Sequence, residues 1–125
     1  MRTDVVTRST ILLGALPRML RSILERAVTS QADFQLAEGC EGVDLEDAVA
    51  RCGADVLIVG ERADRSEAFY RPLFVTHPSL KVFILTQDGR NVTFMGFRRV
   101  RFADASPTSL IEAIRSELRH EAAEE

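Results

Sequence analysis

The cationic and aromatic side chains near residue 100 are the part of the chain best suited to hold a ligand. The set comprises Arg90, Arg98, Arg99 and Arg101, interleaved with Phe94, Phe97 and Phe102. Guanidinium groups bind phosphate and aromatic rings stack on bases, so this set can hold a nucleotide, another small anion or RNA. The alternative is that the arginines line the solvent side of an edge strand, where they discourage edge-to-edge association.

A second set of candidates lies where apolar runs end. The run "DVLIVG" ends at Gly60 and is followed by Glu61, and "KVFILT" ends at Thr86. Parallel sheets bind ligands at the carboxyl ends of their strands, so Thr86 and Glu61 are the polar side chains such an edge would offer. The sequence contains none of the glycine-rich phosphate-binding, serine-nucleophile or zinc-protease motifs. His77 and His120 stand apart from other candidates and suit a turn and a helix end.

Strand-like and helix-like patterns alternate along the chain. We expect strands at 10–14, 33–39, 55–60 and 81–86, and helices at 16–27, 44–52, 66–80 and 106–118. Asp44 and Ser106 suit helix caps and Gly53 a helix end, whereas Pro72 limits the third helix. This alternation predicts an α/β domain with a parallel sheet and helices on both faces.

The first of these helices has a clear apolar stripe, which we expect to face the core. Its members are Leu16, Met19, Leu20, Ile23, Leu24 and Ala27. Arg18, Arg21 and Arg26 fall on the other side of the helix and are expected in solvent.

Length and composition narrow the class of protein. A chain of 125 residues suits a single domain spanning 1–125, with its core at about 9–119 and frayed ends. The net charge of -3 is too balanced for electrostatic capture of nucleic acid or an anionic membrane. Without a long apolar stretch or a signal peptide, we expect a cytoplasmic protein. Cys40 and Cys52 form no C-x-x-C pair and are interpreted as free thiols, not as a disulfide framework or a zinc site.

Several stretches of the sequence resemble the receiver domains of two-component response regulators, particularly those of the LuxR type. They are "ILLGALPRMLRSILE", "AEGCEGVDLEDAVARCGADVLIVG", "HPSLKVFILT" and, closest of all, "DASPTSLIEAIRSEL". Together they cover most of the chain. The resemblance implies a single flavodoxin-like (βα)5 domain of receiver type.

The chain departs from the receiver pattern at the reactive positions. The acidic pair that would hold Mg²⁺ is replaced by Gly14 and Ala15, the phosphoryl-accepting Asp by Gly60, and the Lys that would neutralise the phosphoryl group by Ala103, whereas Thr86 is retained. Phosphoryl transfer needs a nucleophile and cations that offset developing charge, so the resemblance implies a pseudo-receiver with no catalytic residue, no metal and no cofactor. A one-residue slip would make Glu61 the acceptor only if the strand ended before it, because neighbouring strand residues face opposite sides.

The segment from Thr86 to Asp104 is shorter than its counterpart in typical receivers. Its pattern alternates as strands do, with Val92 and Phe94 on one side, and Asp88-Gly89 suits a turn. We therefore expect the fourth receiver helix to be shortened or replaced by a hairpin or loop.

Three functions follow from these patterns. The first is a stand-alone, phosphorylation-independent signalling module that binds a protein, either another chain or a second copy of itself as a homodimer. Its expected contact residues are Phe94, Phe97, Arg98, Arg99 and Arg101, beside the final helix from Pro107 to Arg119. The second is a sensor of a small anion such as a nucleotide, bound by the same arginines. A true phosphoacceptor is the third.

Overall fold

The structure is a computed structural model that describes residues 8–37, 44–62, 67–96, 100–104 and 106–123. The described strands form one sheet and comprise β1 (Ser9–Leu13), β2 (Phe34–Leu36), β3 (Val56–Gly60), β4 (Lys81–Leu85), β5 (Val92–Met95) and β6 (Val100–Phe102). The described helices are α1 (Arg18–Thr29), α2 (Leu45–Cys52), α3 (Glu67–Thr76) and α4 (Pro107–Ala123). The predicted alternation of strands and helices is confirmed up to β4.

The strand order in the sheet is β2-β1-β3-β4-β5-β6. Pairings among β2, β1, β3 and β4 are parallel, with Ile11 opposite Val56 and Ile58 opposite Phe83. β5 is antiparallel to both of its neighbours, so β6 runs in the same direction as β4. The predicted α/β sheet is therefore present and mostly parallel. In the described residues between β4 and β6, a strand stands where a receiver would have its fourth helix.

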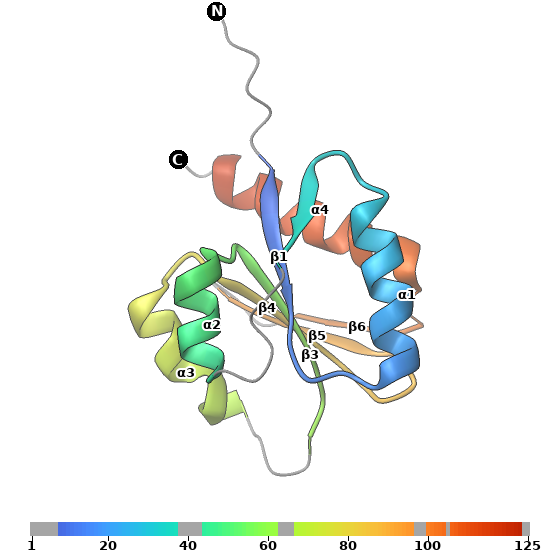
Figure 1. Cartoon of the computed structure of the whole chain (residues 1–125), viewed down its shortest axis with the longest axis horizontal. Helices are drawn as coiled ribbons and strands as arrows, with labels where there is room; N and C mark the ends of the chain where they lie inside the picture. The colour runs from blue at the N-terminus through green and yellow to red at the C-terminus, as the bar shows by residue number, and fades with distance from the viewer. Residues whose placement is uncertain (1–7, 38–43, 63–66, 97–99, 105, 124–125) are drawn as a thin grey trace, which may run out of the picture.

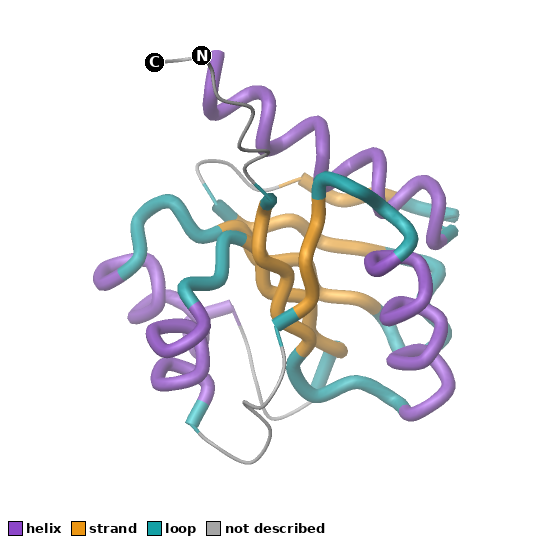
Figure 2. The backbone as a smooth tube through the Cα atoms, turned by 45° about the horizontal axis from the view of Figure 1, so that its top comes forward, coloured by secondary structure: helices purple, strands orange, loops and turns teal. Residues whose placement is uncertain are grey.

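Two helical layers cover the sheet, and each has its own apolar core (Figure 1). Leu24 and Val28 of α1 and Ile114 of α4 pack against one face of the sheet. Val49 of α2 and Tyr70 of α3 pack against the other face. Figure 2 shows the strands between the two layers. β1 and β3 are buried from both sides, because their side chains alternate between the two cores.

Two helices begin, and one ends, as the sequence predicts. The Asp44 side chain accepts a hydrogen bond from the Glu46 N–H, and Gly53 ends α2 at φ 61°, a conformation that favours glycine. At α4, Ser106 Oγ accepts from the Ser109 N–H at 3.2 Å. α3 passes through Pro72, which the sequence predicted to limit it. Pro72 lies on the exposed side of that helix, where water can satisfy the carbonyl that proline leaves unpaired.

The apolar stripe predicted for α1 is only partly buried. Leu24 is buried, but Met19 is 77% exposed and Ile23 is 43% exposed. Val28, which the stripe omitted, is fully buried. The residues that contact the sheet therefore lie further round the helix than the apolar spacing suggested, and Met19 and Ile23 are left on its outer surface.

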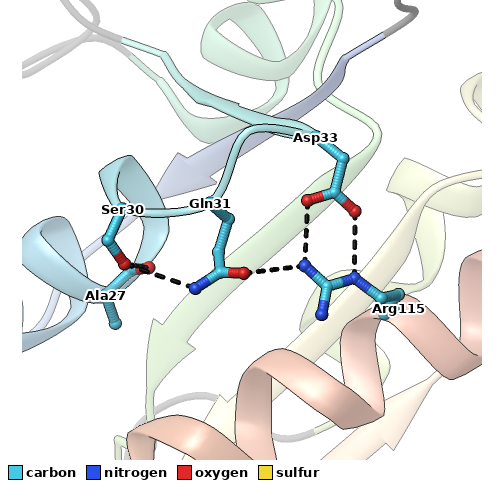
Figure 3. Close-up of polar contacts among 5 residues, drawn as sticks. All are labelled: Ala27, Ser30, Gln31, Asp33 and Arg115. Carbon is cyan, nitrogen blue, oxygen red and sulfur yellow. Dashed lines mark hydrogen bonds and ion pairs between the residues drawn. The ribbon is translucent and has the colours of Figure 1, made fainter.

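Arg115 connects α4 to the segment that leads into β2 (Figure 3). Its Nε and Nη2 each donate to an oxygen of Asp33 at 2.9 Å, and Nη2 also donates to Gln31 Oε1 at 2.8 Å. The guanidinium carbon is 5.3 Å from the centre of the Phe34 ring. This fork of hydrogen bonds lowers the pKa of Asp33 and fixes the last helix against an edge strand of the sheet.

Cys52 is disulfide-bonded, and no described cysteine is a free thiol. The prediction of a free thiol is therefore wrong for Cys52, whereas Cys40 lies outside the described residues. Within the described ranges, no helix combines the length and the apolar character needed to cross a bilayer.

Candidate functional site at the carboxyl edge of the sheet

The carboxyl ends of β1, β3 and β4 meet at one edge of the sheet, where the sequence placed its candidates. β1 is followed by Gly14, β3 ends at Gly60, and β4 is followed by Thr86. Parallel α/β sheets bind their ligands at this edge. The contacts of these three residues decide what the edge can do.

Gly60 lies directly beneath the connection from β1 to α1. Its N–H donates to the carbonyl of Ala15 at 2.8 Å. A Cβ atom added at Gly60 would be 3.0 Å from that carbonyl oxygen and 3.6 Å from Pro17 Cδ. A side chain at this position would therefore crowd the Ala15 carbonyl, which would have to shift by a few tenths of an ångström, and would be in contact with the proline ring.

Gly14, which directly follows the neighbouring strand β1, is also closely packed. Its N–H donates to the Ile58 carbonyl at 2.8 Å, which continues the hydrogen bonding of β1 with β3. A Cβ added at Gly14 would be 2.6 Å from Val59 Cγ1, closer than such atoms approach in real proteins. A larger residue at Gly14 therefore requires Val59 to move.

Thr86 is used by the turn between β4 and β5. Its hydroxyl donates to Asp88 Oδ1 at 2.7 Å and accepts from the Asn91 N–H at 3.1 Å. The second donor to Asp88 Oδ1 is the Arg90 N–H at 3.0 Å. The Thr86 hydroxyl and then the Arg90 N–H lower the pKa of the Asp88 carboxyl. Thr86 thus closes a hairpin turn in this chain.

Arg21 is a residue of this edge that the sequence prediction missed. Its Nη1 donates to the carbonyl of Gly14 at 2.8 Å, and its Nε is 3.4 Å from a carboxylate oxygen of Glu25. The guanidinium therefore occupies a carbonyl at the end of β1 that a ligand could otherwise use. The helical spacing predicts Arg21 in solvent, but a long side chain one turn into a helix can reach back to the end of the preceding strand.

The turn after β4 also contacts the first helix. Gly89 has φ 73°, and a Cβ added there would be 3.0 Å from Leu20 Cδ1. Glycine therefore lets the turn lie against α1. Together with the Arg21 contact, this packing joins the turn, the helix and the end of β1 into one structure.

The other candidates at this edge are exposed. Glu61 lies outside the sheet with its N–H donating to the Leu85 carbonyl at 2.6 Å, and Ala103 is exposed in the connection after β6. The exposure of Glu61 agrees with a surface residue at a strand end. No group of three or more potential metal ligands occurs in the part of the chain that the structure describes.

The expected partner-binding residues have different outcomes. Phe94 is 1% exposed, and its ring centre lies 5.1 Å from that of Phe83 in the core. It therefore packs internally, and the prediction that it contacts a partner is wrong, because its side of β5 faces the α1 and α4 layer. Arg101 of β6 lies opposite Thr93 of β5 in the antiparallel pairing of these two strands. The predictions for Phe97, Arg98 and Arg99 fall outside the described residues.

What remains at the carboxyl edge is a hydrogen-bonded junction. No side chain projects from Gly14 or Gly60, and Thr86 and Arg21 satisfy neighbouring groups of the chain itself. Beside Gly60, an added Cβ would meet the Ala15 carbonyl oxygen at 3.0 Å. Its geometry can hold the β1–α1 connection, the β4–β5 turn and α1 in fixed positions.

Comparisons of the chain with models of protein families, with curated proteins and with solved structures produce no match.

Proposed function

We propose that this chain is a pseudo-receiver, a regulatory module that binds another protein without being phosphorylated and without catalysing a reaction. The described topology is compatible with the flavodoxin-like arrangement of receivers, since the order β2-β1-β3-β4 is parallel and helices cover both faces. The insertion of β5 before β6 is the main departure. β5 takes the place of the fourth helix, which follows the fourth strand in typical receivers.

The observation that carries the proposal is the closure of the edge at Gly60. The Gly60 N–H donates to Ala15, and a Cβ would lie 3.0 Å from the same carbonyl oxygen. An aspartate in place of Gly60 would crowd this carbonyl, whereas a receiver that had merely lost its acceptor would be expected to retain an open edge. This supports a function that does not depend on a phosphoryl group and that acts through recognition of the outer surface.

Thr86 supports the same proposal from the neighbouring strand. The resemblance implies that Thr86 is the one reactive position of the receiver pattern that this chain retains. Here it binds Asp88 and Asn91, which hold the hairpin closed. The chain would thus present one fixed conformation to its partner, which would be either another protein or a second copy.

The proposal is tested by capture of partners from an extract of the source cells. The immobilised protein is incubated with Mg²⁺ alone, with Mg²⁺ and acetyl phosphate, or with a chelator, and bound proteins are quantified. Native mass spectrometry of the purified protein measures self-association in parallel. We expect a saturable partner, displaced by excess untagged protein and captured equally in all three conditions. Capture that requires acetyl phosphate would contradict the proposal, as would the lack of any saturable partner including a second copy.

A further inference from the structure

The outer face of α1 displays apolar side chains that the domain itself leaves uncovered. These side chains are Met19, which is 77% exposed, and Ile23, which lies one turn later and is 43% exposed. The helix buries Leu24 and Val28 against the sheet instead. Two large apolar residues on successive turns form a continuous apolar strip, which is unlike singly scattered surface residues.

Two cations lie along one side of this strip. With 3.6 residues per turn, Arg18, Met19, Ser22, Ile23 and Arg26 fall within an arc of roughly 140° around the helix. All five are exposed. Among the described residues, neither the Arg18 nor the Arg26 side chain has a hydrogen-bond or ion-pair partner. We call these five residues the α1 face.

The α1 face also lacks a carboxylate. Glu25 is the only acidic residue of α1, and its carboxylate pairs with Arg21 at the border of the face. The chain as a whole carries a net charge of -3, so this face has the opposite sign to the molecule that bears it. Such local charge selects a partner segment that is acidic.

We propose that the α1 face is the docking site for an acidic amphipathic segment of a partner protein. Apolar side chains of that segment cover Met19 and Ile23, while its carboxylates pair with Arg18 and Arg26. This inference rests on the proposed function, because it assigns the binding surface of the same module. A symmetric dimer through two copies of the α1 face would bring arginines against arginines, which favours a partner of different sequence.

The exposed apolar residues of α3 provide a comparison on the other side of the sheet. Phe69 is 44% exposed and Val75 is 83% exposed, and α3 packs against the opposite core from α1. Arg71 is also exposed on that helix. α3 thus supplies matched control positions, an exposed apolar residue and an exposed arginine remote from the α1 face (Figure 1).

Three synthetic helical peptides test the proposal by fluorescence anisotropy with the full chain. The first carries leucines on one face and glutamates elsewhere, the second replaces the glutamates by lysines, and the third keeps the glutamates but replaces the leucines by serines. We expect the acidic leucine peptide alone to bind well, with affinity falling as salt is raised. Equal binding of all three peptides, or no binding of the acidic leucine peptide at low salt, would overturn the proposal.

Variants then locate the binding site. We expect Arg18→Glu combined with Arg26→Glu to weaken the acidic leucine peptide roughly tenfold and to favour the lysine peptide. Met19→Ser should weaken the same peptide, whereas Arg71→Glu and Val75→Ser should leave its affinity unchanged. All of these positions are exposed, so circular dichroism should show that folding is retained. If the control variants weaken binding as much as the α1 variants, the proposed site is wrong.

The same variants separate this inference from the proposed function. If the native chain and the variant with both Arg18→Glu and Arg26→Glu capture the same partner from the extract in equal amounts, the proposed function as a binding module is retained. That result would show that the α1 face is not its binding site. Failure of the native chain to capture any partner would count against the proposed function itself. The peptide measurements do not depend on that capture.

Discussion

Placing an aspartate at Gly60, the acceptor position that the proposed pseudo-receiver lacks, should destabilise the protein without making it a phosphoryl acceptor. Gly60→Asp places a side chain where the Ala15 carbonyl and the Pro17 ring already lie, with the Cβ 3.0 Å from Ala15 O. The backbone at Gly60 is not left-handed, so the cost comes from crowding. The three atoms nearest to that Cβ are the Ala15 carbonyl oxygen and two carbon atoms, none of which can donate a hydrogen bond to a carboxylate.

The magnitude follows from these two contributions. Overpacking a filled site costs about 1–3 kcal/mol, and the reduced freedom of the unfolded chain returns about 0.4–1 kcal/mol of that. A carboxylate that is enclosed without donors adds about 1–3 kcal/mol. We therefore expect Gly60→Ala to lower the free energy of unfolding by about 1 kcal/mol and Gly60→Asp to lower it by about 3 kcal/mol.

Urea denaturation followed by circular dichroism measures both variants beside the native chain at neutral pH. Gly60→Ala is the matched control, because it adds the crowding Cβ without the carboxylate. The aspartate variant is then incubated with acetyl phosphate and Mg²⁺ and its mass is measured. An aspartate variant as stable as the native chain would show that the edge is open, and the reasoning about Gly60 would be refuted. A mass gain would show that other groups still supply the metal site.

Further substitutions test other parts of the fold. Arg115→Lys cannot reproduce the two parallel hydrogen bonds to Asp33, and urea denaturation should show a loss of about 1 kcal/mol at neutral pH. The pKa of Asp33 is lowered on folding, so its pairing with Arg115 stabilises the fold at pH values above the ordinary pKa of 3.8, and this stabilisation is lost as the pH falls through the lowered pKa. The difference in free energy of unfolding between the native chain and Asp33→Asn should therefore shrink in acid and stay constant around neutral pH. Asp44→Ala removes the cap of α2 and should lower the free energy of unfolding by about 1 kcal/mol, and no change would mean that the cap does not stabilise the helix. Gly14→Ala should destabilise by about 1–3 kcal/mol, and Val59→Ala in the same chain should recover part of that loss; additive losses in a double-mutant cycle would contradict the 2.6 Å contact.

Short-range signals made much of the fold predictable. Asp44 and Gly53 delimit α2 through local hydrogen bonding and backbone freedom, and neither depends on distant parts of the chain. Apolar runs located the buried strands β1, β3 and β4 because they are covered from both sides. The hairpin followed from its alternating pattern and from the Asp88-Gly89 turn.

Side-chain direction was harder to predict. Met19 and Ile23 fit the apolar spacing of α1, but the rotation of that helix on the sheet is set by Leu24 and Val28 together with α4. Phe94 looks like a contact residue in the sequence, yet the pairing of β5 with β4 brings it against Phe83. In each case the decisive contact is made with a residue distant in the chain.

The candidate site divides in the same way. The identities of Gly14, Gly60 and Thr86, read through the resemblance, predict that phosphoryl transfer is absent, and this stays a prediction. They do not predict the contacts of these positions, because the contact of Gly60 with Ala15 joins β3 to the connection after β1, and the reach of Arg21 to Gly14 depends on the placement of α1. An absent group is visible in a sequence, whereas the packing that replaces it requires the fold.

Intact-protein mass spectrometry after incubation of the native chain with acetyl phosphate and Mg²⁺ tests the central claim most directly. A receiver with a working aspartate, run in parallel, confirms that the phosphoryl donor is active. The closed edge at Gly60 and the use of Thr86 in the hairpin predict that the mass of the native chain stays unchanged at every donor concentration. A saturable gain of one phosphoryl group would contradict the account, and mapping it to Glu61 would show that the acceptor had moved by one residue.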